Sequence, residues 1–260
     1  MPEALNAQSK KPINMPGYDN ETFHYGFILS YNQTFLSANY IENYQTEPHI
    51  GGLPPIDGIN DSFKNYPYYI QDITTTMRHG LTIGFVGNIR LSQYFDLRLI
   101  PSISPTVERT VYYQIKGQQE TENGIIDKVV VIPYSLNSTC IGAPIQIKYK
   151  AKRNCNNTAY IIAGANPQID LGWVKADKSN NQDNTEETSN NIELLVNKFD
   201  IAAEIGAGFD FYTGFIKFGV ELKMSYGLFD IRKKEGNNNL YSNSFDNLRN
   251  KVFYLSFTIE

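Results

Sequence analysis

The stretch from residue 201 to residue 227, IAAEIGAGFDFYTGFIKFGVELKMSYG, alternates apolar residues with polar residues or glycine. Apolar side chains occupy the odd positions from 201 to 211 and the even positions from 216 to 226. Successive side chains of a β-strand point to opposite faces, so this pattern predicts two strands, each with one face in an apolar medium. The phase changes around Thr213, which predicts a tight turn between them.

The same period of two recurs along the rest of the chain. It is clear in Phe23–Tyr31 and in Phe253–Ile259, and weaker in the middle of the sequence. The pattern predicts an all-β, eight-stranded antiparallel up-and-down barrel, with strands at 22–40, 79–91, 94–112, 138–151, 157–172, 197–212, 214–229 and 249–260.

The connections between these strands alternate in length. Short turns are expected near Ser92, Arg153 and Thr213, while long loops rich in Asn, Gly, Pro, Asp and Ser are expected at 41–78, 113–137, 173–196 and 230–248. Bacterial outer-membrane barrels have short periplasmic turns and longer external loops. We therefore predict a transmembrane barrel at 22–260 with both termini periplasmic. A flexible segment would precede it at 1–21, in which 1–7 is either a signal-peptide remnant or a chance string.

Periodicity alone leaves the direction of the apolar face open, because a soluble lipocalin-like barrel points it inward and a membrane barrel points it outward. Long apolar faces, and opposite charges mixed with glycine on the polar faces, favour the membrane arrangement. The lumen would then hold a structural network of paired charges, since eight strands leave room only for side chains. The predicted lumen residues are Arg98, Lys148, Glu204, Lys217, Glu221 and Lys223, and the predicted lipid-facing residues are Phe23, Phe27, Leu29, Phe209, Phe218, Leu222, Leu255 and Phe257.

Composition and motifs exclude several classes of function. A net charge of −4 argues against nucleic-acid partners. The three histidines His24, His49 and His79 form no catalytic or zinc pattern, and Cys140 and Cys155 fit neither a disulfide framework nor a metal site. The acidic stretch 177–187 lacks the spacing of a calcium loop and is better explained as a solvated loop. We therefore expect no enzyme activity, no catalytic residue, no cofactor, no metal and no small-molecule substrate.

Several motifs follow one another along the chain: Tyr18-Asp19, Phe23–Phe27, Asp96–Arg98 with Pro101, Ile205–Tyr212 followed by Phe215–Phe218, Glu221–Lys223, Tyr226–Leu228 and Leu248–Phe257. In their order and spacing, these motifs resemble the PorT family of Bacteroidetes outer-membrane proteins. The resemblance covers nearly the whole barrel and is thin in the long loops. The final residues Thr258–Glu260 depart from the aromatic terminus usual in barrel-insertion signals.

The resemblance implies a component of the type IX secretion system, which exports proteins with a C-terminal sorting domain and delivers surface adhesins in gliding bacteria. Other secretion subunits and outer-membrane lipid would then be its partners. Two alternatives remain open at this point. One is a surface-binding or adhesive barrel that uses loops 41–78 and 173–196. The other is a soluble lipocalin-like carrier.

Overall fold

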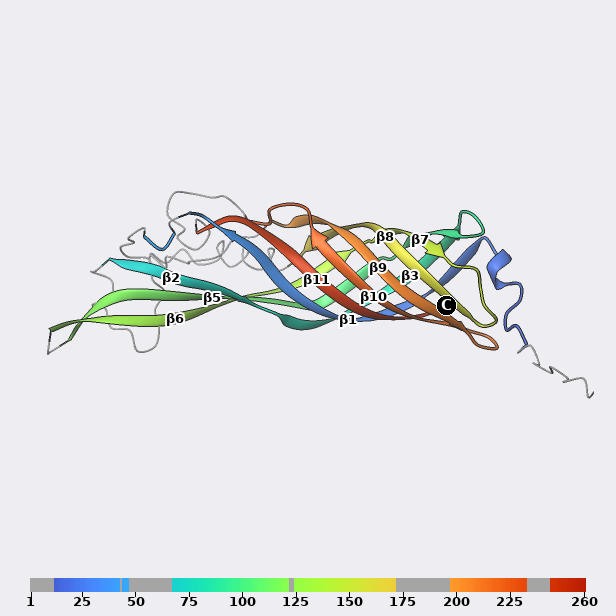
Figure 1. Ribbon diagram of the computed structural model, residues 1–260, viewed down its shortest axis with the longest axis horizontal. Coiled ribbons are helices and arrows are strands. Elements are labelled where there is room, and N and C mark those ends of the chain that lie inside the picture. The colour runs from blue at the N-terminus through green and yellow to red at the C-terminus, as the bar shows by residue number, and fades with distance from the viewer. Residues whose placement is uncertain (1–11, 43, 47–66, 122–123, 172–196, 233–243) are drawn as a thin grey trace, which may run out of the picture.

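The computed structural model describes residues 12–42, 44–46, 67–121, 124–171, 197–232 and 244–260. Within these ranges the chain forms one short 3-10 helix and eleven β-strands (Figure 1). The helix is η1 (Tyr18–Asn20), and the strands are β1 (Phe23–Tyr40), β2 (Tyr68–Thr76), β3 (Arg78–Arg90), β4 (Phe95–Leu99), β5 (Ser102–Thr121), β6 (Gly124–Gly142), β7 (Ile145–Lys150), β8 (Asn157–Asp170), β9 (Phe199–Tyr212), β10 (Lys217–Gly227) and β11 (Phe245–Ile259).

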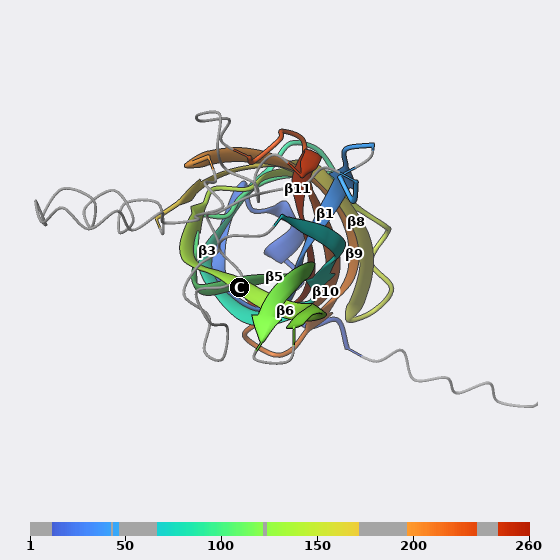
Figure 2. The same cartoon turned by 90° about the vertical axis from the view of Figure 1, so that its left-hand side faces the viewer.

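The strands close into one antiparallel ring. β1 pairs with β3 on one side and with β11 on the other, so the first and last strands of the chain are neighbours. The ring continues through β4 and β7 to β8, β9 and β10. Figure 2 shows the ring from one end. The predicted antiparallel all-β barrel is confirmed.

Two of the eight predicted strands are each interrupted in the structure, and the predicted strand 79–91 is preceded by a further strand on the same pass. β2 and β3 are separated at Met77, β4 and β5 at Ile100–Pro101, and β6 and β7 at Ala143–Pro144. Proline has no N–H to donate to the ladder, so a break at these two prolines is the expected local result. Each interrupted pair continues in the same direction along the barrel, and the chain therefore makes its passes in the predicted order.

The prediction of long loops was wrong at three places. Residues 68–76 of the expected loop 41–78 form β2, and the described residues of 113–137 belong to β5 and β6. β11 begins at Phe245, inside the expected loop 230–248. The described residues of 113–137 belong to a hairpin in which Thr121 pairs with Gly124 and the ladder continues down to Ser102. Its second arm carries the apolar residues Ile125, Ile126 and Val129–Ile132, a strand signal that the loop assignment overlooked. The expected loop 173–196 lies outside the described residues.

β2 and the outer parts of β5 and β6 project beyond the barrel (Figure 1). At the base of the projection, buried apolar side chains form a cluster that includes Ile70, Val111, Tyr113, Phe245 and Leu248. The prediction that apolar faces point only outward is therefore wrong in this part. A register shift between Ser104 and Val107 is the local reason on β5: it changes which residues face inward, because one extra residue reverses the alternation.

Both ends of the described chain lie at the opposite end of the barrel, beside the short turns (Figure 1). Residues 12–21, assigned from the sequence to a flexible segment, contact this end, where the side-chain amide of Asn14 donates to the backbone carbonyl of Tyr212. In the described ranges, no helix has the length and apolar character needed to cross a membrane.

Candidate functional site in the barrel lumen

The alternation seen in the sequence separates charged from apolar side chains across the barrel wall. On β10 the side chain of Leu222 is 65% exposed on the outside, while its neighbour Glu221 is 0% exposed. All six residues predicted for the lumen are buried, and seven of the eight predicted to face lipid are exposed; Phe218 is half-buried. A lipocalin-like barrel would bury the apolar side chains and expose the charged ones. The half of the barrel near the short turns does the opposite, so that alternative was wrong.

The centre of the lumen holds an ion pair between Arg98 of β4 and Glu221 of β10. The guanidinium of Arg98 donates to Glu221 Oε2 at 2.7 Å. The hydroxyl of Tyr160, from β8, donates to the same oxygen at 3.2 Å. Three strands on different sides of the ring are therefore connected through one carboxylate.

A second group of charges lies nearer the short turns. Lys148 of β7 donates to Asp210 at 2.6 Å, and its ammonium lies 3.7 Å from the ring centre of Tyr160. Lys217 donates to Glu260 at 2.5 Å and lies 3.9 Å from Asp210. The ammonium groups and carboxylates thus alternate, which offsets the cost of burying each charge.

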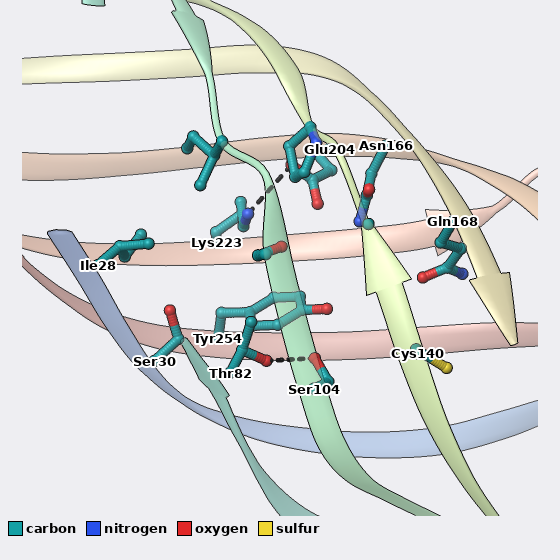
Figure 3. A pocket seen from close by; sticks show the side chains of 14 residues that line it. Ile28, Ser30, Thr82, Ser104, Cys140, Asn166, Gln168, Glu204, Lys223 and Tyr254 are labelled. Atoms are coloured by element: carbon teal, nitrogen blue, oxygen red, sulfur yellow. Dashed lines mark hydrogen bonds and ion pairs between the residues drawn. The ribbon is translucent and has the colours of Figure 1, made fainter. Parts of the chain in front are cut away.

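A third group surrounds a small cavity on the other side of the central pair (Figure 3). Lys223 donates to Glu204 at 3.1 Å, and the amide of Gln146 donates to the same carboxylate oxygen at 2.5 Å. The cavity has a volume of about 20 Å³, which is room for about one water molecule. The lumen at this level therefore has space for a solvent molecule and not for a solute.

Several lumen charges were missed by the sequence prediction: Asp210 and Glu260, described above, and the members of two further ion pairs. Lys150 pairs with Asp96 at 2.9 Å near the short turns, and Arg109 pairs with Asp170 at 2.5 Å near the apolar cluster. Asp96 and Lys150 share the sequence parity of Arg98 and Lys148, so alternation was a sufficient signal for both. Arg109 lies beyond the register shift on β5, where that signal fails.

The N-terminal segment closes the end of the barrel that carries the short turns. Tyr18 of η1 stacks on His24 with ring centres 3.8 Å apart and donates its hydroxyl to Glu260 at 3.0 Å. Arg153, in the turn between β7 and β8, pairs with Asp19 at 3.3 Å and lies over the ring of Tyr212 at 3.7 Å. η1 is visible through the ring in Figure 2.

These contacts change the ionisation of the groups that close the barrel. Burial by itself would raise the pKa of the Glu260 carboxyl, but the neighbouring ammonium of Lys217, followed by Lys148 and Arg98, holds this pKa below its ordinary value. Burial, and then the charge of Glu260, raise the pKa of the Tyr18 hydroxyl above its ordinary value. The carboxylate is therefore kept ionised and the phenol neutral.

Glycines on the inward face make room for the large side chains of the lumen. A Cβ atom on Gly208 would lie 2.5 Å from the ring of Tyr160, and one on Gly142 would lie 2.8 Å from Asn166 Oδ1. The sequence showed these glycines among the charges but gave no indication of which side chain each one accommodates.

The remaining candidate residues form no catalytic or metal site. His24 is stacked on Tyr18, and His79 is on the outer face, hydrogen-bonded to the hydroxyl of Tyr31. Cys140 and Cys155 are both free. Across the described ranges, no cluster of three or more His, Cys, Asp and Glu residues could hold a metal ion. His49 and the acidic stretch 177–187 lie outside the described residues.

Comparison with known proteins gives the family. Residues 6–233 match the family model described as outer membrane protein beta-barrel domain. The chain belongs to this family. The finding confirms the outer-membrane barrel class, and it is coarser than the resemblance to PorT.

Two solved structures of outer-membrane proteins are similar to this chain at low sequence identity. OprG from Pseudomonas aeruginosa has 9% sequence identity and a TM-score of 0.42, over 92% of this chain and 95% of that one. Ail, the attachment invasion locus protein of Yersinia pestis, was solved in complex with the heparin analogue sucrose octasulfate; it has 8% identity and a TM-score of 0.33, over 92% of this chain and 98% of that one. No curated protein matches the sequence.

Proposed function

We propose that this protein is a non-enzymatic outer-membrane component of the type IX secretion system, and that it acts through the surfaces at its two ends. The observation that carries this proposal is the lumen closed by side chains. The buried Arg98–Glu221 pair crosses the centre of the ring. A barrel filled in this way serves as an anchor and a binding surface and does not conduct solutes.

The outer face supports a position in the membrane. β9 has 14 residues, and at a rise of about 3.4 Å per residue and a tilt of about 40° it reaches roughly 34 Å along the membrane normal. The hydrocarbon core of a bilayer is about 30 Å thick. Phe199 and Phe211, near the two ends of β9, are exposed on the outside at the depths where aromatic girdles lie. The short turns and both termini would then be periplasmic.

The resemblance to PorT supports the secretion role. Two of the motifs that carry it, Tyr18-Asp19 and Ile205–Tyr212, come from distant parts of the chain and meet at the end with the short turns, where the Tyr212 hydroxyl donates to Asp19 at 3.1 Å. This end would face the periplasm, and we propose it as the surface for other secretion subunits.

Deletion of the gene, followed by an assay of secreted sorting-domain proteins, tests the proposal. We expect the sorting-domain proteins to remain in the periplasm of the deletion strain and to be exported again when the gene is restored. The abundance of an unrelated outer-membrane protein controls for general membrane damage. Normal export in the deletion strain would contradict the secretion role and leave the membrane assignment intact.

A second candidate function, adhesion, is favoured by one observation at the projecting end. An open cleft of about 650 Å³ lies there, with Tyr69, Gln71, Lys116, Gln118 and Asp127 among the residues that line it. This volume is in the range of ligand pockets. Shortening the β5–β6 hairpin above Ile115 separates the two functions, because adhesion would fall while export persists.

A further inference from the structure

Two basic side chains lie on the outer face of the barrel, at the edge of its apolar surface that is nearer the projecting strands. We call this the upper edge. Lys251 of β11 is paired in register with Phe35 of β1 on one side and with Tyr226 of β10 on the other. Arg249 lies two residues further along the same face of β11. The four side chains form one patch across three neighbouring strands, which we call the upper basic patch.

The patch is held together by contacts between cations and aromatic rings. The ammonium of Lys251 lies 5.1 Å from the ring centre of Tyr226 and 5.8 Å from that of Phe35. The guanidinium of Arg249 lies 5.8 Å from the ring centre of Tyr226. Both basic residues are half-buried on the outward face, so part of each side chain is open to the surroundings while its charged group lies near an aromatic ring.

The charges of the patch are not neutralised within the described part of the chain. The lumen cations Arg98, Lys148 and Lys217 each have a carboxylate within ion-pair distance. For Arg249 and Lys251 the described residues provide no such carboxylate, and the one side-chain hydrogen bond of Arg249 goes to Asn247 at 3.2 Å. The outward positions of β1, β9 and β10 carry no Asp or Glu, and on β11 the exposed Asp246 forms no ion pair with Arg249 among the described residues. The patch therefore carries two cations that have no ion-pair partner within the described part of the chain.

The depth of the patch identifies the kind of anion. Below Lys251, the outward positions of β11 are Phe253, Leu255, Phe257 and Ile259, all exposed. A charge at the edge of such an apolar surface lies at the level of the lipid headgroups, where aromatic side chains are also enriched. Basic side chains at this level attract anionic headgroups, and phosphate accepts strong charge-assisted hydrogen bonds from Arg and Lys.

We propose that Arg249 and Lys251 bind the phosphate of a phosphorylated lipid headgroup in the leaflet around the upper end of the barrel. This inference rests on the proposed position of the barrel in the outer membrane. It adds to the external surface a binding site for a lipid whose headgroup carries phosphate.

Native mass spectrometry of the full chain in detergent tests the inference, with lipid A as the probe. Lipid A from which the phosphates have been removed and inorganic phosphate serve as the comparison ligands. We expect lipid A to bind and both comparison ligands to bind at least tenfold more weakly. The double variant Arg249→Gln, Lys251→Gln should lose about 30-fold in affinity for lipid A, the loss expected for two basic side chains at an anionic lipid surface.

The matched control also removes one arginine and one lysine, with Arg90→Gln and Lys152→Gln at the short turns, and should bind lipid A like the wild type. Equal binding by the two double variants, or equal binding of phosphorylated and dephosphorylated lipid A, would overturn the inference. Fractionation of the wild type with outer membranes is measured separately. A protein that is found in the outer membrane but fails these lipid assays refutes the lipid site alone.

Discussion

At the residue scale, the lumen charges depend on one another. Arg98 and Glu221 are both fully buried, and each has the other as its ion-pair partner. Removal of one partner from a buried pair leaves a charge without compensation, which costs about 3–5 kcal/mol, whereas replacement of both by apolar residues is often neutral. The pair therefore contributes mainly to the specificity of strand placement.

The first prediction separates these two effects. Arg98→Met should lower the free energy of unfolding by about 3–5 kcal/mol, because Glu221 stays buried and loses its cation. The double variant Arg98→Met, Glu221→Leu should recover most of that loss. Urea unfolding of the detergent-solubilised barrel measures both.

The control for this prediction is an exposed ion pair. Lys116 and Asp127 lie 3.2 Å apart on the projecting hairpin with half-exposed side chains, so Lys116→Gln should change stability by less than about 1 kcal/mol. A double variant as unstable as Arg98→Met would show that the pair itself stabilises the barrel.

The second prediction concerns pH and Glu260, which follows the last strand. Its pKa in the folded protein is held below the ordinary value of 4.5, chiefly by Lys217 against the opposing effect of burial. The ionised carboxylate therefore stabilises the fold above pH 4.5, and this contribution is lost as the pH falls from 4.5 through the lowered folded pKa. Glu260→Gln should reduce stability at pH 7, and its difference from the wild type should shrink toward pH 2.

Because other carboxylates titrate in the same range, the measured quantity is the difference in unfolding free energy between Glu260→Gln and the wild type at each pH. A difference that stays constant from pH 7 to pH 2 would refute the assigned ionisation of Glu260.

Sequence alternation was sufficient to place Arg98 and Glu221 inside and Leu222 outside, since a strand fixes the side of every second residue. It could not give the partners, because those depend on strands that lie across the ring. Tyr160 was missed for this reason: on β8 it occupies an inward position, but its hydroxyl has a function only beside Glu221 of β10.

At the scale of the elements, inward-facing glycines leave space for large lumen side chains in the half of the barrel near the short turns. Gly208 of β9 faces Tyr160 on the neighbouring strand, and an added Cβ would lie 2.5 Å from that ring and 2.6 Å from the carbonyl oxygen of Val220. Backbone on the other side prevents an easy shift. The site has no room for a methyl group.

The third prediction follows from this crowding. Gly208→Ala should destabilise the barrel by about 1–3 kcal/mol through overpacking. Gly214→Ala, in the turn between β9 and β10, should have little effect, because a Cβ there meets no atom within 4 Å. Urea unfolding of the two variants side by side is the measurement, and equal stability would contradict the packing assignment.

The projecting strands form a second element with its own apolar core. Ile70 of β2 is fully buried in the cluster with Val111 and Tyr113, whereas its neighbour Tyr69 points outward. This core explains why the loop prediction failed for 68–76 and 113–137. Turn-forming residues such as Pro133 and Gly124 indicated loops, but the inward apolar residues of these segments pack in one cluster with residues of β1 and β11.

The fourth prediction tests whether this core is separate from the barrel below it. Ile70→Ala should leave a cavity that costs about 2–5 kcal/mol locally. Hydrogen exchange should accelerate in 68–76 and 111–117, while amides of β8, β9 and β10 keep their protection. Tyr69→Ala is the matched control on the outer face and should leave both regions unchanged. Uniform acceleration would show that the two parts unfold together.

At the scale of the whole molecule, the barrel has two interiors. The half near the short turns is filled with alternating cations and carboxylates, and the half below the projection is filled with apolar side chains around Phe245 and Leu248. The sequence predicted the charged half from the period of two. It did not predict the apolar half. A register shift at Pro105–Thr106 reverses the alternation, so that Val111 faces inward, and the sequence around Val111 does not reveal this change.

The last prediction concerns conduction by the whole barrel. The short-turn end is closed twice, first by Tyr18 and Asp19 of the N-terminal segment and then by the Lys148–Asp210 and Arg98–Glu221 pairs within the lumen. In planar lipid bilayers the wild-type protein should therefore show no stable conductance steps. Deletion of residues 1–21 should leave the bilayer equally silent, because the ion pairs remain.

Loss of the central side chains alone should not open the barrel either. Replacement of Tyr160, Arg98 and Glu221 by Ala leaves the Lys148–Asp210 pair, the N-terminal segment and the apolar cluster in place. This variant should therefore stay silent as well if it is folded, which circular dichroism and its unheated electrophoretic mobility establish. A large porin in the same bilayers controls for the sensitivity of the assay. Steady conductance by the wild type would refute the closed lumen, and conductance by the deletion alone would show that the N-terminal segment is the only closure.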